Sequence, residues 1–365
     1  MRIKSIIYFF AILAFFACET SLDEPLCPSS HNAYTSTKSI ESFNPIDELS
    51  GIPVNIINCG NTKNKFLSAR PSGYDVVVYN QDDGSQRQRW YVNSIHISLL
   101  GGNESVWPPI YLGIYNATFD EPWPMLSEMG CALNFTPVQG TPYYFISVYN
   151  YERKVPAYLQ SSTSTGTGLQ FKITGSKTDL GKWEIRPVGE FKVIDIEYFK
   201  TESDVFTRND QIIADAIIEN DRDEPITYHF TVNGSANESS SFSKAEGVSA
   251  SISENSTTSI PNIDSSSSLT ENHNSNANWN FGTSESKAIS VQHSVDIPIP
   301  ARTKCKVEAL VVSHNATVSY IATLQSTSNN NSFRIKGKWN GITTSTFYCK
   351  ITNESTNKLI GIYEF

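Results

Sequence analysis

The chain has 365 residues, a formal net charge of -9 and six cysteines, and 12% of its residues are aromatic. This acidic balance argues against nucleic acid as a partner, because nucleic-acid binding needs a basic patch that neutralises phosphates. The length allows two domains, and the cysteine and aromatic content suits an exported protein rich in β-structure.

The sequence of residues 1–18 predicts that the protein is exported from the cytoplasm. Arg2 and Lys4 precede an apolar run that ends at Cys18 and is too short to cross a membrane as a stable helix. The segment resembles a bacterial lipoprotein signal, which implies that Cys18 is lipidated; an ordinary cleaved signal peptide is the alternative. We therefore expect an outer-membrane or cell-surface lipoprotein of a bacterium, or otherwise a secreted protein. Residues 19–50, acidic and rich in Ser, Thr and Asn, are expected to be a tether with little structure.

Export also permits disulfide bonds. If Cys18 is acylated, the number of remaining cysteines is odd, and one of them stays unpaired. Cys305 and Cys349, both in the C-terminal half, are the pair that we expect to form a disulfide.

Residues 51–188 carry a weak internal repeat of about 45 residues. Each unit opens with an aromatic residue followed by Leu and closes with a large aromatic residue 23 or 24 positions after that Leu. The closing residues are Trp90, Phe135 and Trp183. Three such units predict a pseudo-threefold β-structure in which the closing aromatic side chains lie in the core.

In the first unit, Gln88-Arg89-Trp90 matches a Gln-x-Trp motif, and the region resembles the ricin-type β-trefoil lectins. In that family an aromatic platform and an Asp near the start of the unit hold a sugar. The resemblance implies platforms at Tyr79 and Phe171, with Asn80 and Gln88 as further glycan-binding residues. The three units lack that Asp, so packing and turn roles for Tyr79, Asn80 and Gln88 are the alternative.

Residues 231–290 are dominated by small polar side chains, since 32 of these 60 residues are Ser, Thr or Asn. From Phe242 onward the larger side chains fall on even positions, and after a turn at 260–264 the small polar ones do. This alternation predicts one long two-faced hairpin with arms at 247–256 and 265–274. A solvated hairpin or an unstructured insertion is the alternative.

The C-terminal half, residues 189–365, contains further alternating segments and resembles the aerolysin-type β-pore-forming toxins, in the broad group of epsilon-toxin-like and natterin-like proteins. Beyond the polar hairpin, the resemblance rests on four pieces in the family's order, at 279–282, 296–300, 318–324 and 335–342. That family folds as a long antiparallel β-structure with a tucked hairpin, the pre-stem. Oligomerisation releases these hairpins, which build a transmembrane barrel.

We therefore expect an all-β protein with a β-trefoil-like region at 51–188 and an elongated, antiparallel, aerolysin-like region at 189–365. Its pre-stem hairpin is expected at about 242–281. The expected function is that of a β-pore-forming toxin-like protein, which binds a surface receptor such as a glycan, forms homo-oligomers and inserts the hairpin into a target membrane. The residues expected to enter the membrane are Val248, Ala250, Ile252, Ile260, Pro261, Ile263 and Leu269.

Several titratable residues conflict with this register, and one other function remains open. Glu246, Glu254, Glu271 and His273 share the phase of the apolar positions. Glu254 conflicts most, because a charge facing lipid near the bilayer midplane costs on the order of 2 kcal/mol or more. A cell-surface lectin or adhesin with a β stalk and no pore activity is the alternative function. An enzyme is not expected, because the chain carries none of the common catalytic motifs, and its six histidines lack metal-ligand spacing. No metal or cofactor is expected.

Overall fold

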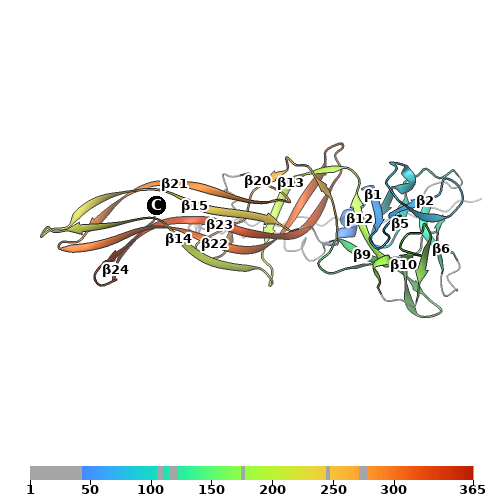
Figure 1. The fold of residues 1–365 in the computed structure, drawn as a ribbon, viewed down its shortest axis with the longest axis horizontal. Coiled ribbons are helices and arrows are strands. Elements are labelled where there is room, and N and C mark those ends of the chain that lie inside the picture. The colour runs from blue at the N-terminus through green and yellow to red at the C-terminus, as the bar shows by residue number, and fades with distance from the viewer. Residues whose placement is uncertain are drawn as a thin grey trace, which may run out of the picture. The chain divides into compact units, whose positions relative to one another are not determined.

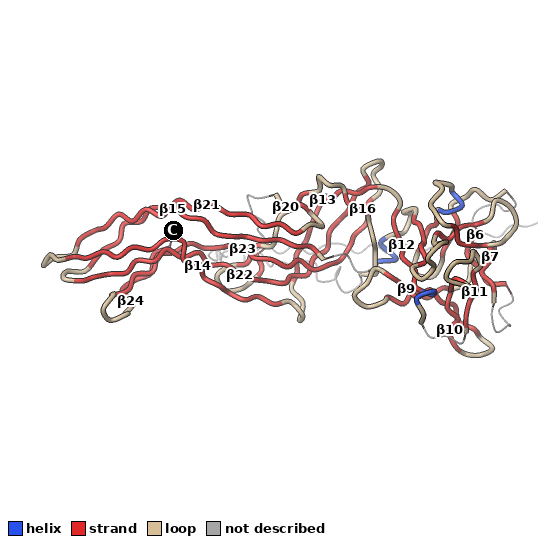
Figure 2. The backbone as a smooth tube through the Cα atoms, viewed as in Figure 1, coloured by secondary structure: helices blue, strands red, loops and turns tan. Residues whose placement is uncertain are grey.

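The structure is a computed structural model, and it describes residues 43–104, 110–115, 122–173, 177–243, 247–270 and 278–364. Its regular structure is almost entirely antiparallel β-strand, which confirms the predicted all-β class (Figure 2). None of the helices in these ranges has the length and apolar character needed to cross a lipid bilayer. The predicted signal at 1–18, with Cys18, lies outside the described residues.

One short helix, α2 (Pro45–Glu48), precedes the strands. Asn44 caps it, because the Asn44 Oδ1 accepts a hydrogen bond from the Ile46 amide at 3.0 Å, and Pro45 occupies the first turn. Ile46 and Leu49 are buried in the main core. The predicted tether at 19–50 is therefore wrong for its last residues, whose apolar side chains pack instead of remaining in water.

Twelve short strands form the first sheet (Figure 1). Three hairpins recur along it, namely β2–β3, β6–β7 and β10–β11, one in each predicted repeat unit. The remaining strands include the continuous path β9-β12-β1-β4-β5, with β8 paired to β9. The strands are β1 (Val54–Asn58), β2 (Phe66–Ala69), β3 (Val76–Tyr79), β4 (Trp90–Val92), β5 (Ile97–Leu99), β6 (Ile110–Tyr115), β7 (Trp123–Ser127), β8 (Leu133–Pro137), β9 (Tyr143–Asn150), β10 (Val155–Ser161), β11 (Leu169–Lys172) and β12 (Lys182–Pro187).

The closing aromatic residues of the first and third units occupy equivalent core positions. Trp90 and Trp183 are fully buried, and each indole N–H donates to the carbonyl oxygen of the Leu that opens its own unit. The acceptors are Leu67, at 3.0 Å, and Leu159, at 2.8 Å. A buried indole N–H needs such a partner, and the repeat spacing supplies it twice. Phe135, the closing residue of the second unit, is only partly buried, so the prediction is weaker there.

Eight strands form the second sheet, in the order β16-β13-β22-β23-β15-β21, with β14 on β22 and β24 on β23; all but β16 and β24 have ten residues or more. β22 pairs with β23 along nearly its whole length, while its other edge is shared by β14 and β13. The strands are β13 (Glu190–Phe199), β14 (Val205–Asn220), β15 (Ile226–Phe242), β16 (Ser251–Ile252), β21 (Ser284–Ile299), β22 (Thr303–Ser326), β23 (Ser332–Asn353) and β24 (Leu359–Glu364).

We call residues 243–283, between β15 and β21, the inserted segment. Its described residues, 243, 247–270 and 278–283, fold back on the second sheet. Their strands are two residues long: β16, β17 (Thr257–Thr258), β18 (Asn262–Ile263), β19 (Leu269–Thr270) and β20 (Trp279–Asn280). The prediction of two continuous arms paired with each other is therefore wrong for the folded chain. β16 pairs with β13, β17 with β20, and β18 with β19. Folding back buries an apolar face that an extended hairpin would leave in water.

The predicted disulfide is also wrong, because Cys305 and Cys349 are buried free thiols. They lie on adjacent strands, but Cys349 is opposite Ala309 and Cys305 is opposite Asn353. An offset of four residues separates the two Cα atoms by roughly 13 Å along the strand. Disulfides require Cα atoms within about 7 Å. Burial raises the pKa of Cys349 to about 11, which keeps it a thiol.

Candidate functional site

The inserted segment interrupts an otherwise continuous hairpin. β15 and β21 pair residue for residue from Ile226 opposite Ile299 to Ser241 opposite Ser284. The ladder stops there because the chain leaves it at Phe242 and returns only at residue 284. In β15 the buried residues are even-numbered: Phe230, Val232, Ala236 and Phe242 are apolar, whereas Glu238 and Ser240, close to the start of the inserted segment, are polar.

The seven residues predicted to enter the membrane are all held against the body of the protein. Val248, Ile260, Pro261 and Ile263 are buried. The other three, Ala250, Ile252 and Leu269, are half-buried and pack against the same core cluster. The structure therefore brings these residues together in a docked arrangement, although not in the strands that the sequence predicted.

Backbone and hydroxyl groups attach the middle of the inserted segment to β13. The amide of Ser253 donates to the carbonyl oxygen of Phe191 at 2.8 Å. The amide of Val193 donates to Oγ of Ser256 at 2.7 Å, and the Tyr198 hydroxyl donates to the carbonyl oxygen of Ser259 at 2.8 Å. These bonds cover an edge strand that would otherwise expose its hydrogen-bonding groups.

Three aromatic rings close the base of the inserted segment. Phe242, where the segment begins, lies 4.8 Å from Phe281, where it ends, measured between ring centroids. Both rings pack against Tyr320 of β22, at 5.7 and 5.6 Å. The Tyr320 hydroxyl also donates to the carbonyl oxygen of Ser243 at 3.1 Å, and burial raises the pKa of Tyr320 well above its ordinary value.

The docked segment does not fill the space beneath it. A partly open cavity of about 410 Å³ lies where the segment meets the second sheet. Val248 and Ile252 line it from the segment, while Tyr320 and Ile335 line it from the sheet. Glu254 also borders the cavity and is exposed, so its carboxylate is hydrated in this state.

At the far end of the segment, a polar turn at 264–268 meets β14 and β22. The Asp264 carboxylate accepts bonds from the amides of Ser266 and Ser268, both at 2.9 Å, and from the Ser266 hydroxyl at 2.6 Å. These donors lower the pKa of Asp264. The turn contacts His314 and Arg208 from other strands. Sequence reasoning missed both residues, because only the fold brings them to the turn.

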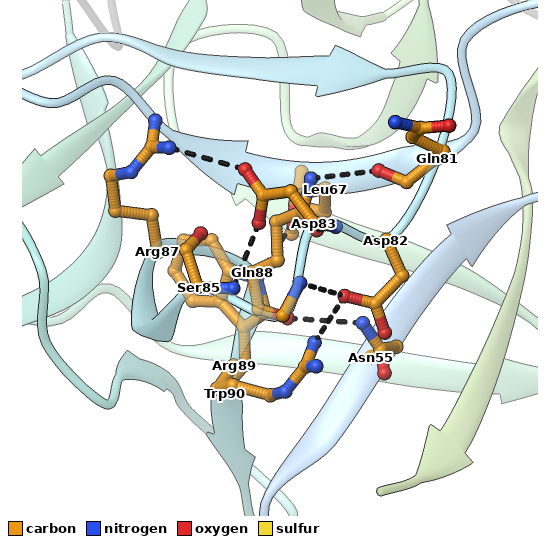
Figure 3. A network of polar contacts seen from close by, with 11 residues as sticks. Asn55, Leu67, Gln81, Asp82, Asp83, Ser85, Arg87, Gln88, Arg89 and Trp90 are labelled. Carbon is orange, nitrogen blue, oxygen red and sulfur yellow. Dashed lines mark hydrogen bonds and ion pairs between the residues drawn. The ribbon is translucent and has the colours of Figure 1, made fainter.

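Two of the four predicted glycan-binding residues, Gln88 and Phe171, are buried. Figure 3 shows Gln88 inside a turn, where its Oε1 accepts from the Asp83 amide at 2.9 Å and its Nε2 donates to the carbonyl oxygen of Gln81 at 3.1 Å. Gln88 is fully buried and organises this turn, which ion pairs of Arg87 and Arg89 with Asp83 and Asp82 also brace. A sugar therefore cannot reach it, and the prediction is wrong for Gln88.

Phe171 is wrong as a platform for a different reason. Val78 lies opposite Leu67, and Phe171 lies opposite Leu159, so the fold equates Phe171 with Val78 and not with Tyr79. Shifting a strand by one residue turns each side chain to the opposite face, and Phe171 is fully buried. Tyr79 is half-buried and Asn80 is exposed; their roles stay predictions.

A pair of aromatic side chains that sequence reasoning missed stands exposed on the first sheet. Tyr115 and Trp123 face each other across β6 and β7, with 53% and 56% of their surface exposed. Their ring planes are 20° from parallel, and their centroids lie 6.4 Å apart. In the described ranges, no group of three or more His, Cys, Asp or Glu side chains is arranged to hold a metal ion.

Comparisons with known proteins give likeness only in structure. No known family and no curated protein matches the chain. Among solved structures, the chain is similar to the Lamprey immune protein, with 13% identity and a TM-score of 0.37 over 86% of this chain and 95% of that one. It is similar to the Mpp75Aa1.1 β-pore-forming protein from Brevibacillus laterosporus, with 11% identity and a TM-score of 0.29 over 64% and 86% of the two chains. It is also similar to parasporin-2, a Bacillus thuringiensis toxin that recognizes cancer cells, with 15% identity and a TM-score of 0.25 over 48% of this chain and 75% of that one. These TM-scores are too low to support a functional inference, so the proposal below rests on the geometry of this chain.

Proposed function

We propose that the chain is a β-pore-forming toxin-like protein that binds a surface receptor, assembles into homo-oligomers and inserts residues 243–283 into a target membrane. The observation that carries this proposal is the interrupted hairpin. β15 and β21 pair in register up to Ser241 and Ser284, and the described residues between them bury apolar side chains against the body of the protein. Release of the inserted segment could extend the hairpin without breaking any pair in that ladder.

The existing register defines what the extended hairpin would look like. Continued beyond Ser241 and Ser284, it reaches its turn at Asn262 and Ile263, inside the turn predicted from sequence. Each arm would gain about 20 residues, or roughly 66 Å at about 3.3 Å per residue. The apolar band of a barrel in a membrane is only about 25 Å tall. The inserted segment is therefore long enough to cross.

The even-odd phase of the buried residues in β15 and β21 continues into the inserted segment. On β15 the buried residues are even-numbered, and Val248, Ile252 and Ile260 keep this phase. On the returning arm, Ile263 and Leu269 would join the same face, because even residues of β15 lie beside odd residues of β21. The opposite face would present mainly Ser, Thr and Asn, which suits a wet lumen.

The same register places Glu254 opposite Glu271 on the apolar face, where two like charges oppose each other. Glu254 would lie on the apolar face about eight residues from the turn, or roughly 26 Å along the strand. When the turn reaches one interface of the bilayer, this carboxylate would lie close to the other. Charges near the interfaces cost only about 0–1 kcal/mol.

Docking and insertion would compete for the same apolar side chains. Burying one aliphatic side chain is worth about 1.5–3 kcal/mol, so Val248, Ile260 and Ile263 together favour docking by roughly 5–9 kcal/mol. Membrane burial would replace this contribution after release. A single inserted hairpin leaves edge groups without hydrogen bonds in lipid, so insertion requires several chains.

We further propose that residues 51–188 form a β-trefoil that binds the receptor. The three hairpins and the equivalent buried tryptophans support this proposal. The exposed pair Tyr115 and Trp123 offers an apolar surface on which a sugar ring could stack, so a glycan is the proposed receptor class. Residues 1–18 remain proposed as a lipoprotein-type signal with Cys18 as the lipidated residue. Catalysis is no part of this function.

A disulfide lock tests the proposed release. Glu190 and Ser251 are exposed Cα partners on the parallel pair β13–β16, so Glu190→Cys with Ser251→Cys places two thiols at a spacing suited to a disulfide. The control, Lys192→Cys with Gln325→Cys, joins β13 to β22 and leaves the inserted segment free.

Dye release from liposomes made of target-type lipid extract is the readout, together with SDS-resistant oligomers on gels. We expect the Glu190–Ser251 lock to block leakage until reductant is added, while the control pair leaks in both conditions. Equal leakage from the oxidised lock would show that the segment does not need to move. An absence of leakage from the unmodified protein would favour an adhesin.

A further inference from the structure

The turn at 264–268 is seated on one side chain of the second sheet. Oγ of Ser267 lies 3.1 Å from Nε2 of His314, on β22. Ser267 has a φ of 63°, which is uncommon for a residue with a side chain. Arg208, opposite His314 on β14, makes a longer second contact, from its Nη1 to the carbonyl oxygen of Ser265 at 3.4 Å. We call residues 262–268 the tip of the inserted segment. Polar groups therefore attach the tip to the second sheet.

His314 is fully buried, but only one of its two ring nitrogens, Nε2, has a hydrogen-bonding partner in the described part of the chain. Its Nδ1 has no hydrogen-bonding partner within the part of the chain that the structure describes. A neutral imidazole tolerates this arrangement if Nδ1 carries the lone pair and Nε2–H donates to Ser267. A protonated imidazole does not, because its Nδ1–H needs an acceptor and its charge would be enclosed.

The charged groups around His314 do not favour a second cation. β14 contributes Arg208 and Asp210, which pair with each other at 2.8 Å, and Tyr348 of β23 donates to Asp210 at 2.8 Å. The turn contributes Asp264, whose carboxylate is occupied by donors of its own turn. Burial and the Arg208 charge lower the pKa of His314, while Asp210 and Asp264 oppose this with smaller effects.

We propose that the 264–268 turn and His314 form a proton-sensitive latch: neutral His314 holds the tip of the inserted segment on the sheet, and protonation in mild acid releases it. This inference rests on the proposed function, because it names the condition under which the segment leaves the sheet. The proton binds at the imidazole of His314, and the segment that moves is the turn at 264–268.

The sign follows from the difference between the docked and released forms. After release, His314 faces water and regains its ordinary pKa of 6.5. The docked form then binds fewer protons, so docking weakens as the pH falls from 6.5 toward the lower pKa of docked His314. Within that window the ratio of released to docked tip rises by up to about tenfold per pH unit. Above it, docking does not depend on this group.

Amide hydrogen exchange of residues 257–270 tests the latch without any membrane. Purified protein is labelled from about pH 7.5 down to about pH 5, with labelling times corrected for the intrinsic pH dependence of exchange. We expect protection of 257–270 to fall by up to about tenfold per pH unit below 6.5, while β12 stays protected. His314→Gln, which does not titrate, should abolish this dependence. His229→Gln is the matched control, because His229 is exposed and paired with Asp296, and it should respond as the wild type does.

A histidine NMR titration of the wild type keeps the test decisive if His314→Gln folds poorly. His314 is expected to titrate below 6.5. Titration at or above this value, protection that ignores pH in the wild type, or a pH response that survives His314→Gln would each overturn the latch. Dye release separates the two proposals. Acid exposure of 257–270 without leakage would support the latch and contradict the pore, whereas leakage that rises in acid while 257–270 stays protected would contradict the latch.

Discussion

Ile263→Ala tests how firmly the tip of the inserted segment is held. Ile263 is fully buried, lies opposite Leu269 in the β18–β19 pair and belongs to the main core cluster. Truncating a buried isoleucine to alanine costs about 2–5 kcal/mol. This cost falls on the docked form, because Ile263 packs into the core only while the segment is docked. Even about 2 kcal/mol would raise the released fraction about 30-fold.

Limited proteolysis followed by mass spectrometry measures the effect, with liposome leakage as a second readout. We expect cleavage within 247–270 to accelerate about 30-fold or more, and leakage to begin at lower protein concentration. Leu126→Ala is the control, because Leu126 is equally buried but lies on β7 in the first sheet. If Ile263→Ala lowers the unfolding midpoint as the control does, yet leaves cleavage at the wild-type rate, the tip is not held by its own packing.

Three further predictions concern the core, the start of the inserted segment and the thiols. Trp90→Ala should lower the free energy of unfolding in urea by about 3–5 kcal/mol, since the indole is fully buried and hydrogen-bonded; an unchanged midpoint would contradict its core position. Gly247→Ala should expose the inserted segment to protease, because Gly247 has a φ of 78° and a Cβ there would collide with the Tyr144 hydroxyl. Wild-type cleavage rates in that variant would mean that the turn adapts. Reductant should not change the thermal midpoint, because Cys305 and Cys349 are free thiols; a lower midpoint in reductant would reveal a disulfide.

The sequence was informative wherever a pattern depends on neighbours along the chain. Alternation predicted the all-β class and the two faces that β15 and β21 display. The repeat spacing predicted the core positions of Trp90 and Trp183, because the distance from Leu to the closing aromatic residue is a property of one unit. Both patterns depend only on residues that are close in the sequence, so they could be interpreted without knowing how distant strands pack.

What the sequence did not predict depends on contacts between distant strands. The inserted segment was expected as an extended hairpin, but Ser256 bonds to Val193 and Ser267 bonds to His314, across large separations in the chain. The two-residue periodicity of a strand determines which side chains share a face, but it does not determine which surface of the protein that face packs against. The same limit explains Phe171, since an error of one residue in strand register reverses its orientation.

The unbroken β15–β21 ladder has a kinetic consequence. Forming a new hairpin normally requires a costly first step, in which loop closure is paid for before the first cross-strand pairs form. Here sixteen pairs already exist and end where the inserted segment begins. Growth of the proposed hairpin would need no nucleation and would add one neighbouring pair after another, as in a zipper. Elementary hairpin formation takes about 1–10 μs, so the speed of conversion would be set by the undocking of the segment and by encounters between chains.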